Sequence, residues 1–181
     1  MSHKYPVLYV ACILLTASSC SSTKKAGSSP NAPENTAVRP SSAKTFTKPL
    51  PVSREEFVSY AKTLLGTPYK YGSANPANGL DCSGFVYNVF THFNVKCPRT
   101  SKEYTNEGTE LLLKNALPGD IILFTGSDHK SGIVGHMGIV TENNRELKFI
   151  HSATSNSRGV IISTYAGYYK DHFVKLIRVL E

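Results

Sequence analysis

Asp81-Cys82-Ser83-Gly84-Phe85-Val86 places a cysteine where a helix is predicted to begin. Asp81 is a typical N-cap, because its carboxylate can accept the unpaired amide hydrogens of the first helical turn. Apolar residues then recur at helical spacing as far as Phe90, so one face of this helix is predicted to be buried. Cys82 would lie at the positive end of the helix dipole, which favours the nucleophilic thiolate, although the charge of Asp81 opposes that effect. The stretch therefore predicts a cysteine nucleophile, with a buried structural cysteine as the alternative.

The amino-terminal part of the 181-residue chain differs in composition from the rest. Residues 1–19 contain a short apolar run followed by small residues, which predicts a signal peptide. The cysteine that follows, Cys20, is similarly placed to the lipid-modified cysteine of bacterial lipoproteins, and plain secretion is the alternative. Residues 20–50 are rich in Ser, Pro, Ala, Thr and Lys and predict a flexible tether. Residues 51–181 are expected to form one folded domain.

The formal charge of +7 is concentrated before this domain. Residues 1–50 hold six basic residues and one acidic residue, whereas residues 51–181 hold 14 basic and 12 acidic residues. Such a leader suits an anionic lipid or wall-polymer surface. No nucleic-acid motif accompanies it, so no nucleic-acid partner is predicted.

The domain contains only two cysteines, Cys82 and Cys97. We expect two free thiols, because a disulfide between them would silence the nucleophile; that disulfide is the alternative. The sequence lacks closely spaced Cys or His ligand pairs, so neither a metal nor another cofactor is predicted.

The order of the expected elements indicates an α+β domain. Ser53, with Glu56 three residues on, predicts the start of a first helix, and a loop over residues 69–80 separates it from the helix that begins at Cys82. A further short helix is possible between residues 100 and 107. Because strands follow helices, we expect an antiparallel sheet of about five to six strands. The expected strands cover residues 121–125, 136–142, 148–154, 160–163 and 173–180.

Two histidines, His136 and His151, lie in neighbouring apolar strands. A two-residue turn would place them opposite each other, and a four-residue turn would place them on a diagonal. Both registers put them on one face of the sheet, whereas an odd turn would separate them. We expect His151 to contact His136 and to be held at its other ring nitrogen by solvent or backbone. A pair of structural sheet histidines is the alternative, and His92, His129 and His172 are expected on the surface.

Six motifs resemble, in order and spacing, those of NlpC-type cell-wall peptidases. The resemblance in their order and spacing extends over nearly all of residues 53–180. They are Gly66-Thr67-Pro68-Tyr69-Lys70-Tyr71-Gly72, Leu80-Asp81-Cys82-Ser83-Gly84-Phe85-Val86, Pro98-Arg99-Thr100-Ser101, Leu117-Pro118-Gly119-Asp120, Gly135-His136-Met137-Gly138-Ile139-Val140 and Phe149-Ile150-His151-Ser152.

The resemblance implies a papain-like fold, with N-terminal helices packed on the sheet, and a Cys-His-polar triad. Cys82 would be the nucleophile, His136 the base and His151 the residue that orients it, while Tyr69 would help to form the oxyanion site. Asp81 and Ser83 resemble substrate-binding residues. Arg99 is a candidate for binding the substrate's carboxylates, and a surface or capping arginine is the equal alternative. Tyr71 is expected to pack in the domain.

The implied reaction is hydrolysis of peptidoglycan stem peptides at the bond between D-γ-glutamate and a diamino acid. A monomer is expected, anchored by lipid to a membrane of the bacterial envelope, with the outer membrane facing the periplasm as the expected site. An amidase or acyl-transfer enzyme that uses the same three residues is one alternative. A non-catalytic wall-binding lipoprotein is another, because a fold alone does not prove activity.

Overall fold

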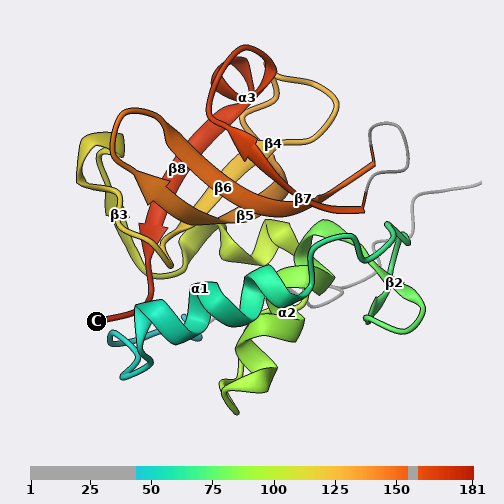
Figure 1. Cartoon of the computed structure of the whole chain (residues 1–181). Coiled ribbons are helices and arrows are strands. Elements are labelled where there is room, and N and C mark those ends of the chain that lie inside the picture. The colour runs from blue at the N-terminus through green and yellow to red at the C-terminus, as the bar shows by residue number, and fades with distance from the viewer. Residues whose placement is uncertain (1–43, 155–158) are drawn as a thin grey trace, which may run out of the picture. The chain divides into compact units, whose positions relative to one another are not determined.

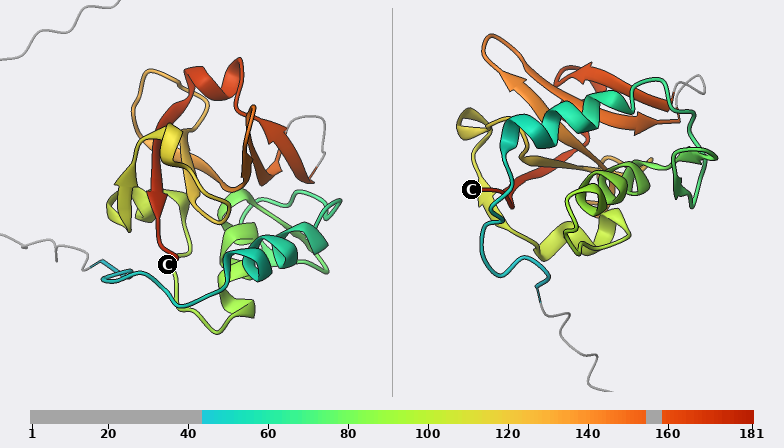
Figure 2. Two further views of the ribbon diagram at one scale, coloured as in Figure 1. Left: turned by 60° about the vertical axis from the view of Figure 1, so that its left-hand side comes forward. Right: turned by 60° about the horizontal axis from the view of Figure 1, so that its bottom comes forward.

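The structure, a computed structural model, describes residues 44–154 and 159–181. The predicted signal peptide and the predicted lipidation of Cys20 concern residues outside these ranges. Helices α1 (Arg54–Thr63) and α2 (Cys82–His92) cover one face of a sheet, as three views show (Figures 1 and 2). All neighbouring strands of that sheet run antiparallel, so the predicted α+β architecture is confirmed. The strand order is β3 (Thr109–Leu111), β8 (Phe173–Arg178), β4 (Ile121–Thr125), β5 (Val134–Asn143), β6 (Leu147–Ala153) and β7 (Gly159–Thr164).

Both helices begin at the predicted caps. The Ser53 hydroxyl accepts a hydrogen bond from the Glu56 amide at 3.3 Å, and the Asp81 carboxylate accepts one from the Gly84 amide. These bonds satisfy amides that have no partner inside the helix. The apolar faces of the two helices are buried against the sheet in the main core, which contains Phe57, Ala61, Phe85, Val89 and Phe90.

Alternating side chains of the sheet serve two cores. Along β4, Ile121 and Leu123 belong to the main core between the helices and the sheet. Ile122 and Phe124 belong to a smaller core on the opposite face of the sheet. This alternation follows from the two-residue period of a strand. The smaller core is completed by α3 (Tyr168–Asp171), through Tyr169, and by the 3-10 helix η2 (Leu113–Asn115).

The β5–β6 hairpin reaches the predicted arrangement by an unexpected route. Asn143 pairs with Leu147, so three residues form the turn, an odd number that alone would separate the two histidines. Thr141 is, however, an extra residue in β5, and the register shifts between Val140 and Glu142. At this bulge two residues of β5 oppose one residue of β6, which shifts the register by one residue. The shift cancels the effect of the odd-numbered turn and returns the two histidines to the same face. His136 and His151 consequently lie diagonally on one face, as the four-residue turn would have placed them.

Several short elements were not anticipated. The loop over residues 69–80 contains a two-stranded hairpin, β1 (Ala74–Asn75) and β2 (Gly79–Leu80). Strands of two residues are too short to show a periodic pattern. The possible helix near residue 100 is present as the 3-10 helix η1 (Ser101–Asn106).

Part of the predicted tether is packed on the domain. The Phe46 side chain is 5% exposed and lies in the main core against Phe90 and Tyr104. The Thr45 and Phe46 amides each donate to the Glu107 carboxylate at 2.9 Å, and Leu50 bridges to Leu180. Residues 45–50 therefore contribute to the fold, although their composition predicts a tether.

Two single-residue expectations are wrong. His172 is buried rather than solvated, because Tyr168 stacks on it and the Tyr168 carbonyl contacts its Nδ1 at 2.8 Å. Tyr71 does not pack in the domain: its side chain is 89% exposed. Its motif position gave no information about the direction in which the side chain points.

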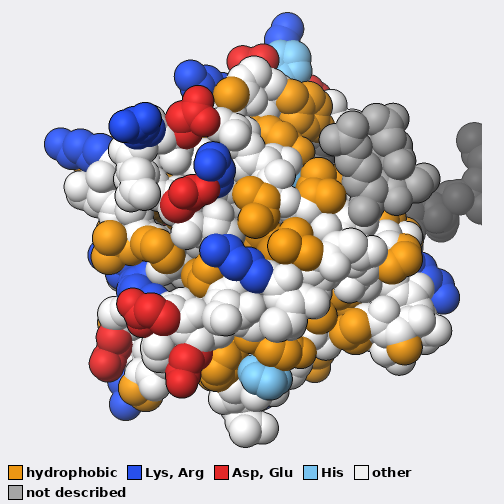
Figure 3. All heavy atoms as spheres, viewed as in Figure 1, with side chains coloured by type: hydrophobic (Ala, Val, Ile, Leu, Met, Phe, Trp, Pro, Cys, Tyr) orange, Lys and Arg blue, Asp and Glu red, His pale blue; other side chains and the backbone are white. Residues whose placement is uncertain are grey.

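The surface shown in Figure 3 carries interspersed basic and acidic side chains, without a continuous basic stretch on that face. This mixture agrees with the near balance of charges in residues 51–181. Among residues 44–154 and 159–181, no helix has both the length and the apolar character needed to cross a bilayer.

Candidate active site

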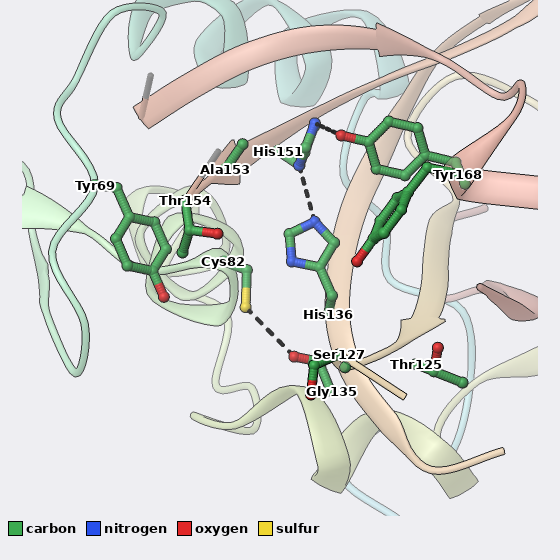
Figure 4. Close-up of a pocket in the computed structure, with 12 residues that line it drawn as sticks. Tyr69, Cys82, Thr125, Ser127, Gly135, His136, His151, Ala153, Thr154 and Tyr168 are labelled. Atoms are coloured by element: carbon green, nitrogen blue, oxygen red, sulfur yellow. Dashed lines mark hydrogen bonds between the residues drawn. The ribbon is translucent and has the colours of Figure 1, made fainter. Parts of the chain in front are cut away.

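Cys82, His136 and His151 meet at a cavity of about 510 Å³. The start of α2 supplies Cys82, and the adjacent strands β5 and β6 supply the histidines. His136 Nε2 lies 2.8 Å from His151 Nδ1, and the other ring nitrogen of His136 faces Cys82 (Figure 4). Cys82 Sγ is 4.0 Å from the Gly135 carbonyl oxygen. The three residues predicted to form the triad are thus brought together in the expected order.

Gly138 makes room for this histidine pair. It lies two residues after His136 on the same strand face, and it is opposite His151 in the β5–β6 register. A Cβ atom at position 138 would lie 2.8 Å from the Ile150 carbonyl oxygen and 3.1 Å from His151 Cβ. Both distances are tight for carbon, so a side chain here would displace the strand or the His151 ring.

His151 is held on its far side by two hydroxyl groups. Its Nε2 lies 3.0 Å from Ser163 Oγ on β7 and 3.2 Å from the Tyr169 hydroxyl oxygen on α3. The expectation that solvent or backbone would hold this nitrogen is therefore wrong. Neither Ser163 nor Tyr169 was singled out from the sequence, since only the pairing of β7 with β6 and the position of α3 bring them to the ring.

Tyr69 lies across Cys82 from His136 and lines the same cavity (Figure 4). Its backbone is fixed by a bridge to Leu80, directly before the α2 cap. Burial, followed by the neighbouring Cys82 and Asp81, raises the pKa of its phenol, so the hydroxyl remains a proton donor at neutral pH. This placement suits the predicted oxyanion role.

Asp81, Ser83 and Arg99, the three predicted substrate-binding residues, form one polar cluster beside Cys82. The Arg99 guanidinium donates to both carboxylate oxygens of Asp81, at 3.1 and 2.9 Å, and to Ser83 Oγ at 3.0 Å. Bonds from Arg99 and the Gly84 amide outweigh burial and lower the Asp81 pKa. The charge of Arg99 is thus already paired within the protein. None of the three lines the 510 Å³ cavity.

Residues 66–178 match the NlpC/P60 family. The chain belongs to the NlpC/P60 family. It is 31% identical over 192 aligned residues to the murein DD-endopeptidase MepS/murein LD-carboxypeptidase of Escherichia coli strain K12, an alignment that covers 97% of this chain and 91% of the relative. It is 32% identical over 136 residues to the bifunctional muramidase/DL-endopeptidase CwlT of Bacillus subtilis. That alignment covers 73% of this chain but only 39% of the relative's length.

Solved NlpC/P60 structures share the fold. An NlpC/P60 family protein from Bacillus cereus superposes with a TM-score of 0.65 at 24% identity, covering 73% of this chain and 42% of that protein. A Staphylococcus aureus protein described as similar to lipoprotein, NLP/P60 family, gives 0.61 at 26% identity, over 75% and 45% of the two chains.

Cys82 and His136, the predicted nucleophile and base, are both uncharged at neutral pH. Burial, with a smaller contribution from Asp81, raises the pKa of the Cys82 thiol to about 11. Burial also lowers the pKa of His136 to about 4 and that of His151 to about 2. The helix start was expected to favour the thiolate, but the loss of hydration and the Asp81 carboxylate outweigh the dipole. A neutral thiol therefore faces a neutral imidazole.

Both domain cysteines are free thiols, as expected. Cys97 is partly buried and packs against the main core, away from the residues that line the cavity. In the part of the chain that the structure describes, no group of three His, Cys, Asp or Glu side chains is placed to hold a metal ion.

Proposed function

We propose that the protein is a cysteine endopeptidase that cleaves the stem peptides of peptidoglycan. Its family is one of peptidoglycan hydrolases, with relatives that are named endopeptidases. The observation that carries the cysteine mechanism is the alignment of Cys82 with the paired rings of His136 and His151 at one cavity. A nucleophile, a base and a group that orients the base are the parts that covalent amide hydrolysis needs.

The mechanism begins with the neutral pair. As Cys82 Sγ attacks the amide carbonyl carbon, the thiol proton passes to the ring nitrogen of His136 that faces it. The Tyr69 hydroxyl donates to the developing oxyanion. His136 then gives the proton to the leaving amine, and a thioester remains on Cys82. A water molecule, deprotonated by His136, attacks that thioester and releases the acid together with the thiol.

The bond that we propose is the one between D-γ-glutamate and the diamino acid. CwlT is named a DL-endopeptidase, and a second Bacillus subtilis relative, 32% identical over 129 residues, is named a gamma-DL-glutamyl hydrolase. The chain spans only 39% and 30% of these relatives, so the bond stands as a proposal. Arg99 contributes less than expected to carboxylate recognition, because its charge is paired with Asp81.

A second candidate is the DD bond of a peptide crosslink. A relative that aligns with nearly the whole chain, MepS of Escherichia coli, is named a murein DD-endopeptidase and LD-carboxypeptidase. Both candidate reactions would use the same thiol, base and cavity, so they differ in where the peptide is held rather than in the chemistry.

Mass spectrometry of sacculi digested with the full-length protein tests the proposal. Cleavage at the proposed bond gives fragments that end in D-glutamate, with new amines on the diamino acid. Loss of crosslinked dimers, with tetrapeptides intact, would instead establish the DD activity. Release of whole stem peptides from muramic acid would overturn both and favour the amidase. Cys82→Ala protein is the matched control, since it keeps the cavity without the nucleophile.

We further propose that Cys20 carries a lipid that holds the domain at the bacterial envelope, on the periplasmic side of the outer membrane. The apolar run before Cys20 and the polar residues after it support this placement. The Cys20→Ala variant should leave the membrane fraction, while Cys12→Ala should remain in it. A Cys20→Ala protein that sediments with membranes like the unmodified chain would refute the anchor.

A further inference from the structure

The contacts behind Cys82 extend past the triad. His151 Nε2 faces both Ser163 Oγ at 3.0 Å and the Tyr169 hydroxyl oxygen at 3.2 Å. We propose that Ser163 and Tyr169 are positioning residues that hold His151, and through it His136, in the one tautomer that can accept the Cys82 proton. This inference rests on the proposed function, in which His136 is the base.

The series of hydrogen bonds from His136 through His151 to the two hydroxyls has one productive arrangement of protons. To accept a proton from Cys82, His136 must be unprotonated at Nδ1, and its proton is then at Nε2. That N–H donates to His151 Nδ1 over 2.8 Å, which places the His151 proton at Nε2. The Nε2–H of His151 therefore needs an acceptor, and the oxygens of Ser163 and Tyr169 are the two within reach.

The opposite form is inactive. If a hydroxyl donated to His151 Nε2, the His151 proton would move to Nδ1 and donate to His136 Nε2. His136 would then carry its proton at Nδ1, toward Cys82, and would have no lone pair for the thiol proton. Two oxygens that converge on one nitrogen favour the productive form, because an N–H can be shared by two acceptors, whereas one lone pair serves two donors poorly.

The protein fixes these hydroxyls independently of each other. Ser163 is carried by β7, which pairs with β6 beside the His151 strand. The Tyr169 ring packs against Phe149 and Phe124, with centroid separations of 4.9 and 5.4 Å. Because the His151 side chain is fully buried, these two hydroxyls, rather than solvent, contact its Nε2 in the intact protein.

Tyr169→Phe and Ser163→Ala remove the acceptors and leave the Tyr169 ring and the strand backbone in place. We expect each single variant to lower kcat moderately and the double variant to lower it by about 10- to 100-fold, with KM little changed. Such a loss is part of the ~10²–10⁴-fold that general acid–base catalysis supplies. Ser163→Thr, which keeps the hydroxyl, should restore activity in the Tyr169→Phe background relative to Ser163→Ala. Tyr165→Phe is the matched control, since Tyr165 is a neighbouring tyrosine outside the cavity.

Nitrogen NMR of full-length protein labelled at histidine gives a readout that does not need substrate. The unmodified chain should show His136 protonated at Nε2, and the double variant should shift His136 toward the Nδ1–H form. An unchanged tautomer pattern in a folded double variant would overturn the inference, as would equal loss of activity in Tyr165→Phe. If the unmodified protein showed the expected tautomers but did not cut sacculi, the proposed function would fail and the positioning role would stand.

Discussion

The Nε2 atom of His136 lies 2.8 Å from Nδ1 of His151, although the turn that joins their strands has the wrong parity. The bulge at Thr141 corrects it. This contact links the fold to the proposed chemistry. Because His151 is neutral, it can hold His136 in one tautomer without placing a charge beside the ring. Burial, with a smaller contribution from His172, lowers the pKa of His136 to about 4.

Replacing the nucleophile separates chemistry from folding. Cys82→Ser should lower kcat/KM on peptidoglycan by on the order of 10³-fold or more, because removal of a nucleophile leaves only binding and oxyanion stabilisation. The melting temperature should change little, since the substitution is nearly isosteric. Cys97→Ser is the paired control and should retain activity. Normal turnover by Cys82→Ser, measured by release of muropeptides, would disprove the assignment.

The two histidines should respond differently to the same substitution. His136→Asn should abolish turnover, because an amide does not accept the thiol proton as a base. His151→Asn should retain measurable turnover, since an amide oxygen can still accept from His136 Nε2. Initial rates of the two variants, with folding checked by circular dichroism, give the comparison. Equal losses would show that the roles are not distinct.

The pH dependence of kcat/KM reports the base in the free enzyme. Burial lowers the pKa of His136 to about 4, so it stays neutral and active through neutral pH and becomes inactive as the pH falls through about 4.

Burial raises the pKa of the Cys82 thiol to about 11, so its alkylation by iodoacetamide should rise steadily above pH 8. Peptide-resolved mass spectrometry can follow Cys82 apart from the other cysteines. A thiol already fully reactive at pH 6 would contradict this charge state.

Acid should destabilise the fold through the buried histidines. Burial lowers the His151 pKa from 6.5 to about 2, so below pH 6.5 the unfolded chain binds a proton that the folded protein does not. This difference should reduce the free energy of unfolding by about 1.4 kcal/mol per pH unit between pH 6 and pH 3. Urea denaturation at several pH values gives the free energy of unfolding as a function of pH. For His151→Gln, this free energy should fall less steeply with decreasing pH, by about that amount per pH unit. The same pH dependence in the variant and the unmodified protein would argue against a neutral, buried His151.

Phe46 should act as a core residue in spite of its position in a polar segment. Phe46→Ala should lower the free energy of unfolding by about 3 kcal/mol, as a large-to-small change in a core does. Lys48→Ala, in the same segment but exposed, is the control. Equal stability of the two variants in urea would indicate that residues 45–50 are not held on the domain in solution.

The sequence by itself determined the two long helices, the main strands and the chemical groups of the site. Caps and periodic apolar residues act within a few residues, so Asp81, Ser53 and the main strands could be placed before any tertiary contact was known. The helix start singled out Cys82, the two-residue strand period paired His136 with His151, and the resemblance to NlpC-type peptidases joined the three residues as a triad. These features depend on local backbone geometry and on the alternation of side chains, which a linear pattern records directly.

Only the tertiary structure decided what surrounds those groups. Ser163 and Tyr169 reach His151 because β7 pairs with β6 and α3 closes over the small core. Arg99 is paired with Asp81, and Phe46 is buried through its contacts with residues that lie far along the chain. The charge state of Cys82 likewise follows from burial, which outweighs the helix dipole that the sequence indicates. Hydration and long-range packing are properties of the whole fold, so local patterns do not encode them.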